Sequence, residues 1–149
     1  MSDVQFIPKL VELASAVGTL DQAEKVAAKE LADVEHLVDP MDGCAITAST
    51  LLRMAGIDVP FTFLALGLDE LLQKRGWMKI PPGQQKAGDL GSTCFGGIRH
   101  PGSDHIFVVC YNLNPQEMIV ADNQAKYPHQ RRTDGQDGKT RTDHFLRAT

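Results

Sequence analysis

The spacing of apolar residues changes once along this chain, from intervals of three and four to an alternation of two. The helical spacing predicts four helices, at Phe6 to Ala14, Leu20 to Leu37, Ala45 to Ala55 and Leu64 to Arg75. Short runs rich in β-branched and aromatic residues follow in the second half of the sequence. Helices first and an antiparallel sheet afterwards are typical of the α+β class, and we expect that class here.

Glycine and proline mark where the predicted helices end. Asp39-Pro40 breaks the second helix, because the residue before a proline is pushed out of the helical region. Gly56 and Gly76 end the third and fourth helices as residues just past the last turn. Pro81-Pro82-Gly83 predicts a surface turn that separates the helical half from the rest.

The second half predicts a hairpin flanked by loops. Gly88-Asp89-Leu90 is expected to open a short strand, and Gly91 to Gly102 reads as a glycine-rich loop. The hairpin strands, the polar loop after them and a final edge strand are expected at His105–Tyr111, Met118–Ala121, 124–141 and Asp143–Arg147.

Length and charge limit the classes of function. A chain of 149 residues fits one domain with one core. The net charge of −4 argues against nucleic acid as a partner, because such binders usually present a basic face. No apolar run approaches the roughly 20 residues that span a bilayer. Met1 to Leu10 lacks the pattern of a secretory signal peptide, so we expect synthesis in the cytoplasm.

Cys44 is the cysteine in the most reactive context. The odd number of cysteines leaves at least one outside any pairing, and no C-x-x-C spacing favours zinc or redox chemistry. Asp42 is a good N-cap that would place Cys44 in the first turn of a helix, where a thiol pKa falls from about 8.5 toward roughly 3.5–7.5. A buried structural thiol is an equally weighted alternative for Cys44 alone. Cys110 is expected in the core, and the chemistry of Cys94 stays open.

His105 is the candidate base for that thiol. It begins the first hairpin strand, so its imidazole can point into a cleft while the apolar residues after it anchor the strand. By itself, a polar histidine at a strand edge is the commoner interpretation. His100 in the preceding loop is its competitor, and His129 is expected at most to line a groove. His36 and His144 are expected on solvated faces.

A polar residue on the neighbouring strand can orient the imidazole. In a hairpin centred near Asn114, residues 122 to 124 lie opposite residues 105 to 107. Asp122, or alternatively Asn123 or Gln124, is therefore placed to accept a hydrogen bond from His105 and fix its tautomer. A plain strand-ending Asp-Asn turn remains the alternative.

The order of these pieces resembles the papain-like peptidoglycan hydrolases of the NlpC and CHAP types. The matching segments cover roughly residues 40 to 124, and Trp77 to Ile80 also resembles the family's approach to its Gly-Asp segment. The family usually continues Gly-Asp-Leu with large apolar residues, whereas Gly91-Ser92-Thr93 follow here. The segments that carry the resemblance are Asp42-Gly43-Cys44-Ala45, Gly88-Asp89-Leu90, His105-Ile-Phe-Val-Val and Val120-Ala-Asp-Asn123.

The resemblance implies one papain-like catalytic domain over residues 1–149, with residues 1–40 as its N-terminal helical part and 41–149 as its catalytic core. It implies cleavage of an amide bond in peptidoglycan by a Cys44–His105–Asp122 triad, as a peptidase or amidase, with no cofactor. Asn123, Gln124 and Asp42 are supporting candidates. The sulfur and the imidazole are expected to meet in a crevice that solvent can reach.

Three alternatives remain at this point. The same triad serves enzymes that act on protein amides, such as peptidases, deamidases and transglutaminase-like enzymes. A non-catalytic binding module on the same fold would use these residues structurally. A metal site formed by Cys44, His105 and Asp122 is disfavoured, because their spacing is not paired. A wall-acting enzyme without a signal peptide would reach its target by phage lysis or specialised secretion, and an injected toxin would need a cognate immunity protein.

Overall fold

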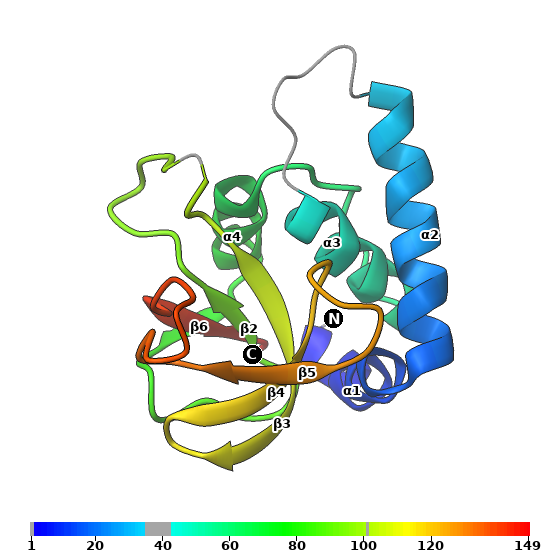
Figure 1. Ribbon diagram of the computed structural model, residues 1–149. Coiled ribbons are helices and arrows are strands. Elements are labelled where there is room, and N and C mark those ends of the chain that lie inside the picture. Colours follow the sequence, from blue (N-terminus) through cyan, green and yellow to red (C-terminus); the bar gives the residue numbers. More distant parts are fainter. Residues whose placement is uncertain (1, 35–42, 101) are drawn as a thin grey trace.

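The predicted helices are present in the computed structural model, which describes residues 2–34, 43–100 and 102–149 (Figure 1). The break expected at Asp39-Pro40 and the N-cap expected at Asp42 lie outside the described residues. A short 3₁₀ helix precedes the α-helices. The elements are η1 (Asp3–Phe6), α1 (Ile7–Ser15), α2 (Val17–Val34), α3 (Gly43–Ala55) and α4 (Ala65–Lys74).

Two glycines end α3 and α4, as the sequence predicts. Gly56 and Gly76 have φ angles of 105° and 95°, which only glycine adopts without a steric penalty. The following residues, Ile57 and Trp77, each donate their N–H to the carbonyl five residues earlier at 3.0 Å. This pattern is the Schellman motif, which satisfies carbonyls at a helix end and turns the chain out of the helix.

The strands of the second half form one antiparallel sheet of six strands, so the α+β class is confirmed. Their order across the sheet is β1-β6-β2-β3-β4-β5. The helices lie along one side of this sheet in Figure 1. The strands are β1 (Met78–Ile80), β2 (Leu90–Ser92), β3 (Ile106–Asn114), β4 (Glu117–Ala121), β5 (His129–Arg132) and β6 (His144–Arg147).

The register of the β3–β4 hairpin agrees with the predicted one. Val108 pairs with Ala121, and Val109 pairs with Val120. One step further along the hairpin, Phe107 lies across from Asp122. Because side chains alternate between the faces of a sheet, His105 falls on the same face as Phe107, and Asp122 on the same face as Val120. The register therefore brings both predicted site residues to one end and one face of the hairpin.

Each face of the sheet has its own apolar cluster. The face with Leu90, Ile106 and Val108 packs against the helices in the larger cluster. Phe107 belongs to the smaller cluster on the other face, which consists of Ile80, Phe107, Val109, Met118, Val120 and Phe145. The candidate site lies at the end of this second face, where the apolar cluster gives way to histidine and carboxylate side chains.

The prediction of an edge strand at Asp143–Arg147 is wrong. Strand β6 lies between β1 and β2, with Phe145 paired to both Ile80 and Gly91. Phe145 and Leu146 are completely buried, one in each apolar cluster, so both faces of this strand are covered. The edges of the sheet are β1 and β5, and β5 lies inside the segment predicted as a polar loop. Its four residues, His129–Arg132, lack the apolar alternation that identifies a strand.

Gly91 leaves space in strand β2 for an aromatic ring from β3. Strand β2 pairs regularly with β3, and Gly91 lies opposite Phe107. A Cβ atom on Gly91 would lie 2.1 Å from Cζ of Phe107, so the aromatic ring occupies the space of the missing side chain. The large residue is supplied by β3 rather than by β2, and the strand expected after the Gly-Asp pair extends to Ser92, two residues into the predicted loop.

Candidate active site

His105 and Asp122 form a buried pair at the end of the hairpin. Nε2 of His105 lies 2.8 Å from Oδ2 of Asp122. His105 is 8% exposed and Asp122 is 1% exposed. The backbone N–H of His105 donates to Oγ1 of Thr93 at 2.7 Å, which fixes the start of the strand beside the end of β2. The structure thus brings together two of the three residues in the predicted triad.

The ionisation of Asp122 determines which nitrogen of His105 faces other groups. Burial by itself raises the pKa of Asp122, but the hydrogen bonds and charges of His105 and His129 outweigh burial and hold that pKa well below its usual range. An ionised carboxylate only accepts hydrogen bonds, so Nε2 of His105 carries the donated proton. Nδ1 is therefore the nitrogen of His105 that remains for exchanging a proton with a thiol or a leaving group.

Cys44 is the second residue of α3, at the helix start that the sequence predicts. The expectation that solvent reaches its sulfur is wrong for this structure, because Cys44 is 0% exposed. The small residues Ala45 and Ala48 also belong to the helix–sheet cluster, so the start of the helix packs closely against its neighbours. Among the described residues of α3, Gly43 is the one that lines the cavity described next. Access to the sulfur therefore requires side chains of the cavity wall to move.

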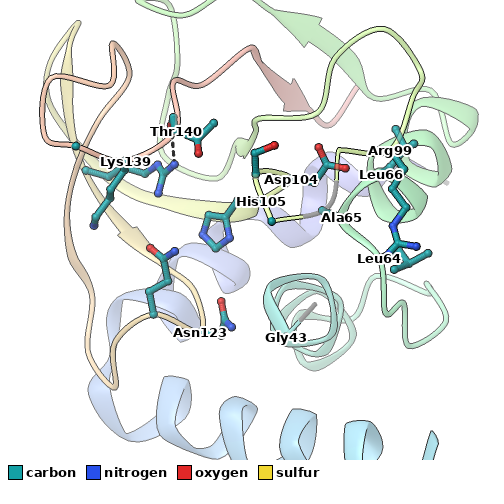
Figure 2. A pocket seen from close by; sticks show the side chains of 15 residues that line it. Gly43, Leu64, Ala65, Leu66, Arg99, Asp104, His105, Asn123, Lys139 and Thr140 are labelled. Atoms are coloured by element: carbon teal, nitrogen blue, oxygen red, sulfur yellow. Dashed lines mark hydrogen bonds between the residues drawn. The ribbon is translucent and has the colours of Figure 1, made fainter. Parts of the chain in front are cut away.

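A cavity of about 680 Å³ lies over His105 and the start of α3. Figure 2 shows the His105 ring at its centre, between Asn123 and Asp104, with Gly43 at the beginning of the helix. The wall is mostly polar and combines segments from both halves of the chain. It is lined by Gly43, Leu64, Ala65, Leu66, Arg99, Gly102, Ser103, Asp104, His105, Asn123, Gln124, Arg131, Gly138, Lys139 and Thr140.

The supporting candidates Asn123 and Gln124 both lie at this cavity, and Asp42 lies outside the described residues. Nδ2 of Asn123 would lie 2.8 Å from a Cβ atom on Gly43, so glycine at this position lets an amide pack against the helix start. The backbone N–H of Gln124 donates to Oδ1 of Asp122 at 2.9 Å. Asn123 therefore lies next to the first helical amides, and Gln124 helps to hold Asp122.

Arg131 places a buried positive charge beside the pair, which the sequence analysis did not identify. It is 1% exposed, its Cζ lies 4.7 Å from the centre of the Phe107 ring, and Nη2 donates to the carbonyl of Thr140 at 2.9 Å. Burial lowers the pKa of Arg131, and electrostatic interactions with Asp122, Asp137 and Cys44 oppose that shift. A guanidinium in this position favours negative charge on Asp122 and on the Cys44 sulfur.

His129 contacts the same carboxylate from the other side. Its Nε2 lies 2.8 Å from Oδ1 of Asp122, and its Nδ1 lies 3.3 Å from Nζ of Lys139. From its sequence context His129 is expected at most to line a groove, and its contact with Asp122 is not predicted. Because His129 pairs with Val120, the His129 side chain lies on the same face of the sheet as Asp122. Strand β5 has no apolar pattern from which the sequence could predict it.

The other described histidines and cysteines do not line this cavity, and the expectation for His36 lies outside the described residues. His144 is buried, which corrects its expected place on a solvated face, and its Nε2 lies 2.7 Å from Oδ2 of Asp69. His100 stacks on Phe95, with ring centres 4.2 Å apart. Cys110 is in the core as predicted, and burial raises the pKa of its thiol to about 11.

The described residues give no support to the metal-binding alternative. Within residues 2–34, 43–100 and 102–149, no cluster of three or more His, Cys, Asp and Glu side chains is arranged to hold a metal ion. In the same part of the chain, no helix is both long enough and apolar enough to cross a membrane.

The chain was compared with models of protein families, with curated proteins and with solved structures, and none of the three comparisons found a match.

Proposed function

We propose that this protein is a cysteine-dependent hydrolase of amide bonds, with Cys44 as nucleophile, His105 as acid and base, and Asp122 as the residue that orients His105. The observation that carries the proposal is the buried His105–Asp122 contact of 2.8 Å at the wall of a cavity of about 680 Å³. The same cavity is lined by Gly43, the residue before Cys44. A histidine oriented by an ionised carboxylate beside a cysteine-bearing helix start is the arrangement that cysteine hydrolases need.

Attack on the amide uses the nitrogen of His105 that faces away from Asp122. The thiol proton passes to Nδ1, and the Cys44 sulfur forms a bond to the carbonyl carbon, whose oxygen takes up negative charge. The backbone N–H of Cys44 and the side-chain amide of Asn123 are the donors for this oxyanion. The carbon–nitrogen bond then breaks as Nδ1–H gives its proton to the leaving amine, which leaves a thioester on Cys44.

Hydrolysis of the thioester reverses these roles. Water attacks the carbonyl carbon while Nδ1 of His105 accepts a proton from it. The carbon–sulfur bond breaks, a carboxylic acid leaves, and the sulfur returns to its starting state. Positioned acid–base help of this kind contributes about 10² to 10⁴ in rate. Asp122 keeps Nε2 protonated throughout both steps, so the reacting proton always moves through Nδ1.

Peptidoglycan is the proposed substrate because of the resemblance to NlpC and CHAP hydrolases in the segments around Cys44, His105 and Asp122. The bond cleaved is an amide within the peptide or at its link to the sugar. Such an enzyme acts outside the cytoplasm, after phage lysis or delivery by a secretion apparatus, and in the second case it needs an immunity protein in the producing cell. A protein amide is the competing substrate, and the experiment below separates the two.

The test is digestion of purified peptidoglycan by the wild-type protein and by Cys44→Ala. We expect soluble fragments with new free amines from the wild type. We expect none above background from Cys44→Ala, because this variant lacks the proposed nucleophile. Cys110→Ala is the matched control, since it removes another buried thiol that does not line the cavity. Equal release by wild type and Cys44→Ala contradicts the catalytic role of Cys44. Release of amines only from a protein substrate would favour the enzyme that acts on protein amides.

Alkylation distinguishes the enzyme from a non-catalytic binding module. Because Cys44 is fully buried in this structure, iodoacetamide must enter through the cavity beside Gly43. We expect Cys44 to be labelled faster than Cys94 and Cys110, and we expect the His105→Ala variant to lose this advantage. Labelling of Cys44 no faster than Cys110 would remove the main support for an activated thiol.

A further inference from the structure

The carboxylate of Asp122 is held by more groups than a triad requires. Oδ2 contacts Nε2 of His105, while Oδ1 accepts the backbone N–H of Gln124 at 2.9 Å and lies 2.8 Å from Nε2 of His129. The backbone bond fixes a turn at the end of β4, but the His129 contact crosses from a different strand. Asp122 is therefore clamped between two imidazoles, and only one of them lines the cavity.

The two neighbours of His129 determine which of its ring nitrogens faces Asp122. The ionised carboxylate of Asp122 can only accept a hydrogen bond, so Nε2 of His129 carries a proton. The ammonium of Lys139 can only donate, so Nδ1 of His129 offers it an electron pair at 3.3 Å. His129 is thus held from both sides, with Nε2 directed at Asp122 and Nδ1 directed at Lys139.

We propose that His129 is a positioning residue, which with Lys139 holds Oδ1 of Asp122 so that Oδ2 stays directed at His105. The inference rests on the proposed hydrolase function for its effect on catalysis. His129 itself does not touch the reacting atoms. It acts through Asp122, whose Oδ1 would otherwise be held by the backbone N–H of Gln124 alone.

Three substitutions of His129 separate a hydrogen bond from simple space filling. His129→Gln keeps an N–H donor at about the reach of Nε2, His129→Asn carries the same amide one methylene too short, and His129→Leu has no donor. We expect kcat to fall about 10- to 100-fold in the Asn and Leu variants, the range found for outer partners that orient functional histidines, with little change in KM. The Gln variant should recover most of the wild-type kcat.

A spectroscopic measurement tests the positioning without any substrate. The Nε2–H proton of His105, hydrogen-bonded to Asp122, gives a low-field imidazole signal in NMR spectra. We expect this signal in the wild type and in His129→Gln, and we expect it to broaden or shift in His129→Asn and His129→Leu. Thermal unfolding confirms that each variant is folded at the temperature of measurement.

The inference is overturned if folded His129→Leu keeps the wild-type kcat and an unchanged His105 signal. It is also overturned if His129→Gln loses as much as His129→Leu, because the retained donor would then be irrelevant. A change of the NMR signal as expected, in a protein that hydrolyses no amide, would support the positioning and refute the hydrolase. The two proposals therefore fail in distinguishable ways.

Discussion

Two buried histidines in this chain each contact a buried aspartate through Nε2, and they differ in their position relative to the cavity beside α3. His105 lies 2.8 Å from Asp122, and His144 lies 2.7 Å from Asp69. The two histidines are similarly buried, at 8% and 6% exposure. His105 lines the cavity beside the start of α3, whereas His144 is not among the residues that line it. A histidine–carboxylate pair is therefore not sufficient to identify a catalytic site.

The surroundings of the two carboxylates explain the difference. Asp69 lies on α4 and accepts hydrogen bonds from Gln73 at 2.6 Å and from Ser92 at 2.5 Å, so it joins the helix to strand β2 as well as to His144. Nδ1 of His144 lies 2.8 Å from the carboxylate of Asp143, so both ring nitrogens of His144 contact carboxylates. The His144–Asp69 pair connects elements of the fold. The His105–Asp122 pair instead leaves Nδ1 of His105 for chemistry in our proposed mechanism.

The largest expected effect separates the two histidines by activity. His105→Ala should lower kcat by about 10² to 10⁴, because no other group can carry the proton at Nδ1. His144→Ala should leave kcat unchanged and reduce the free energy of unfolding by about 3–5 kcal/mol, because Asp69 is left as an unpaired buried charge. Rates on the peptidoglycan substrate and urea unfolding curves measure the two quantities.

His144→Gln serves as the companion variant if His144→Ala does not fold, since its amide can still donate to Asp69. A His144 variant that is fully stable but inactive would break the comparison, because it would give the structural pair a catalytic role.

A smaller effect is expected in the pH dependence of stability at the His144–Asp69 pair. Burial lowers the pKa of His144, but its bonds to Asp69 and Asp143 outweigh burial and raise that pKa above its ordinary 6.5. Burial likewise raises the pKa of Asp69, but hydrogen bonds from His144 and Ser92 outweigh it and lower that pKa below its ordinary 3.8.

The signs of these shifts define a pH window. The contribution of His144 is complete below the unfolded value of 6.5 and is lost as pH rises through the higher folded value. The contribution of Asp69 is complete above 3.8 and is lost as pH falls through the lower folded value. We therefore expect the stability difference between wild type and His144→Gln to be larger at about pH 5 than at about pH 9. An equal difference at both pH values in urea unfolding would contradict the pairing of charges.

The comparison also shows what the sequence reveals about the site and what it hides. The helix start at Cys44 and the hairpin register that joins His105 to Asp122 follow from local rules, namely apolar periodicity, glycine stops and distance from a turn. The contacts of His144 and His129 do not follow from such rules. Each of these residues lies on a short strand whose partners are distant in the sequence or whose polar residues carry no alternation. His144 is buried and His129 is partly buried, and each contacts a carboxylate from another element.

The smallest expected effect concerns a single bond of the structural pair. Gln73 donates to Oδ1 of Asp69 from one turn further along α4, and this bond has no counterpart in the mechanism. Gln73→Met keeps the length and helix preference of the side chain but removes the donor, so it should lower the free energy of unfolding by about 0.5–1.5 kcal/mol. Hydrolysis should be unaffected, because His144 and Ser92 still hold Asp69. Lys74→Met, at the exposed neighbouring position of the same helix, controls for the effect of a new methionine. The contradicting result is a lower kcat with unchanged stability in Gln73→Met and no such change in Lys74→Met. That result would mean that Asp69 affects the cavity and that the two histidine pairs are energetically coupled.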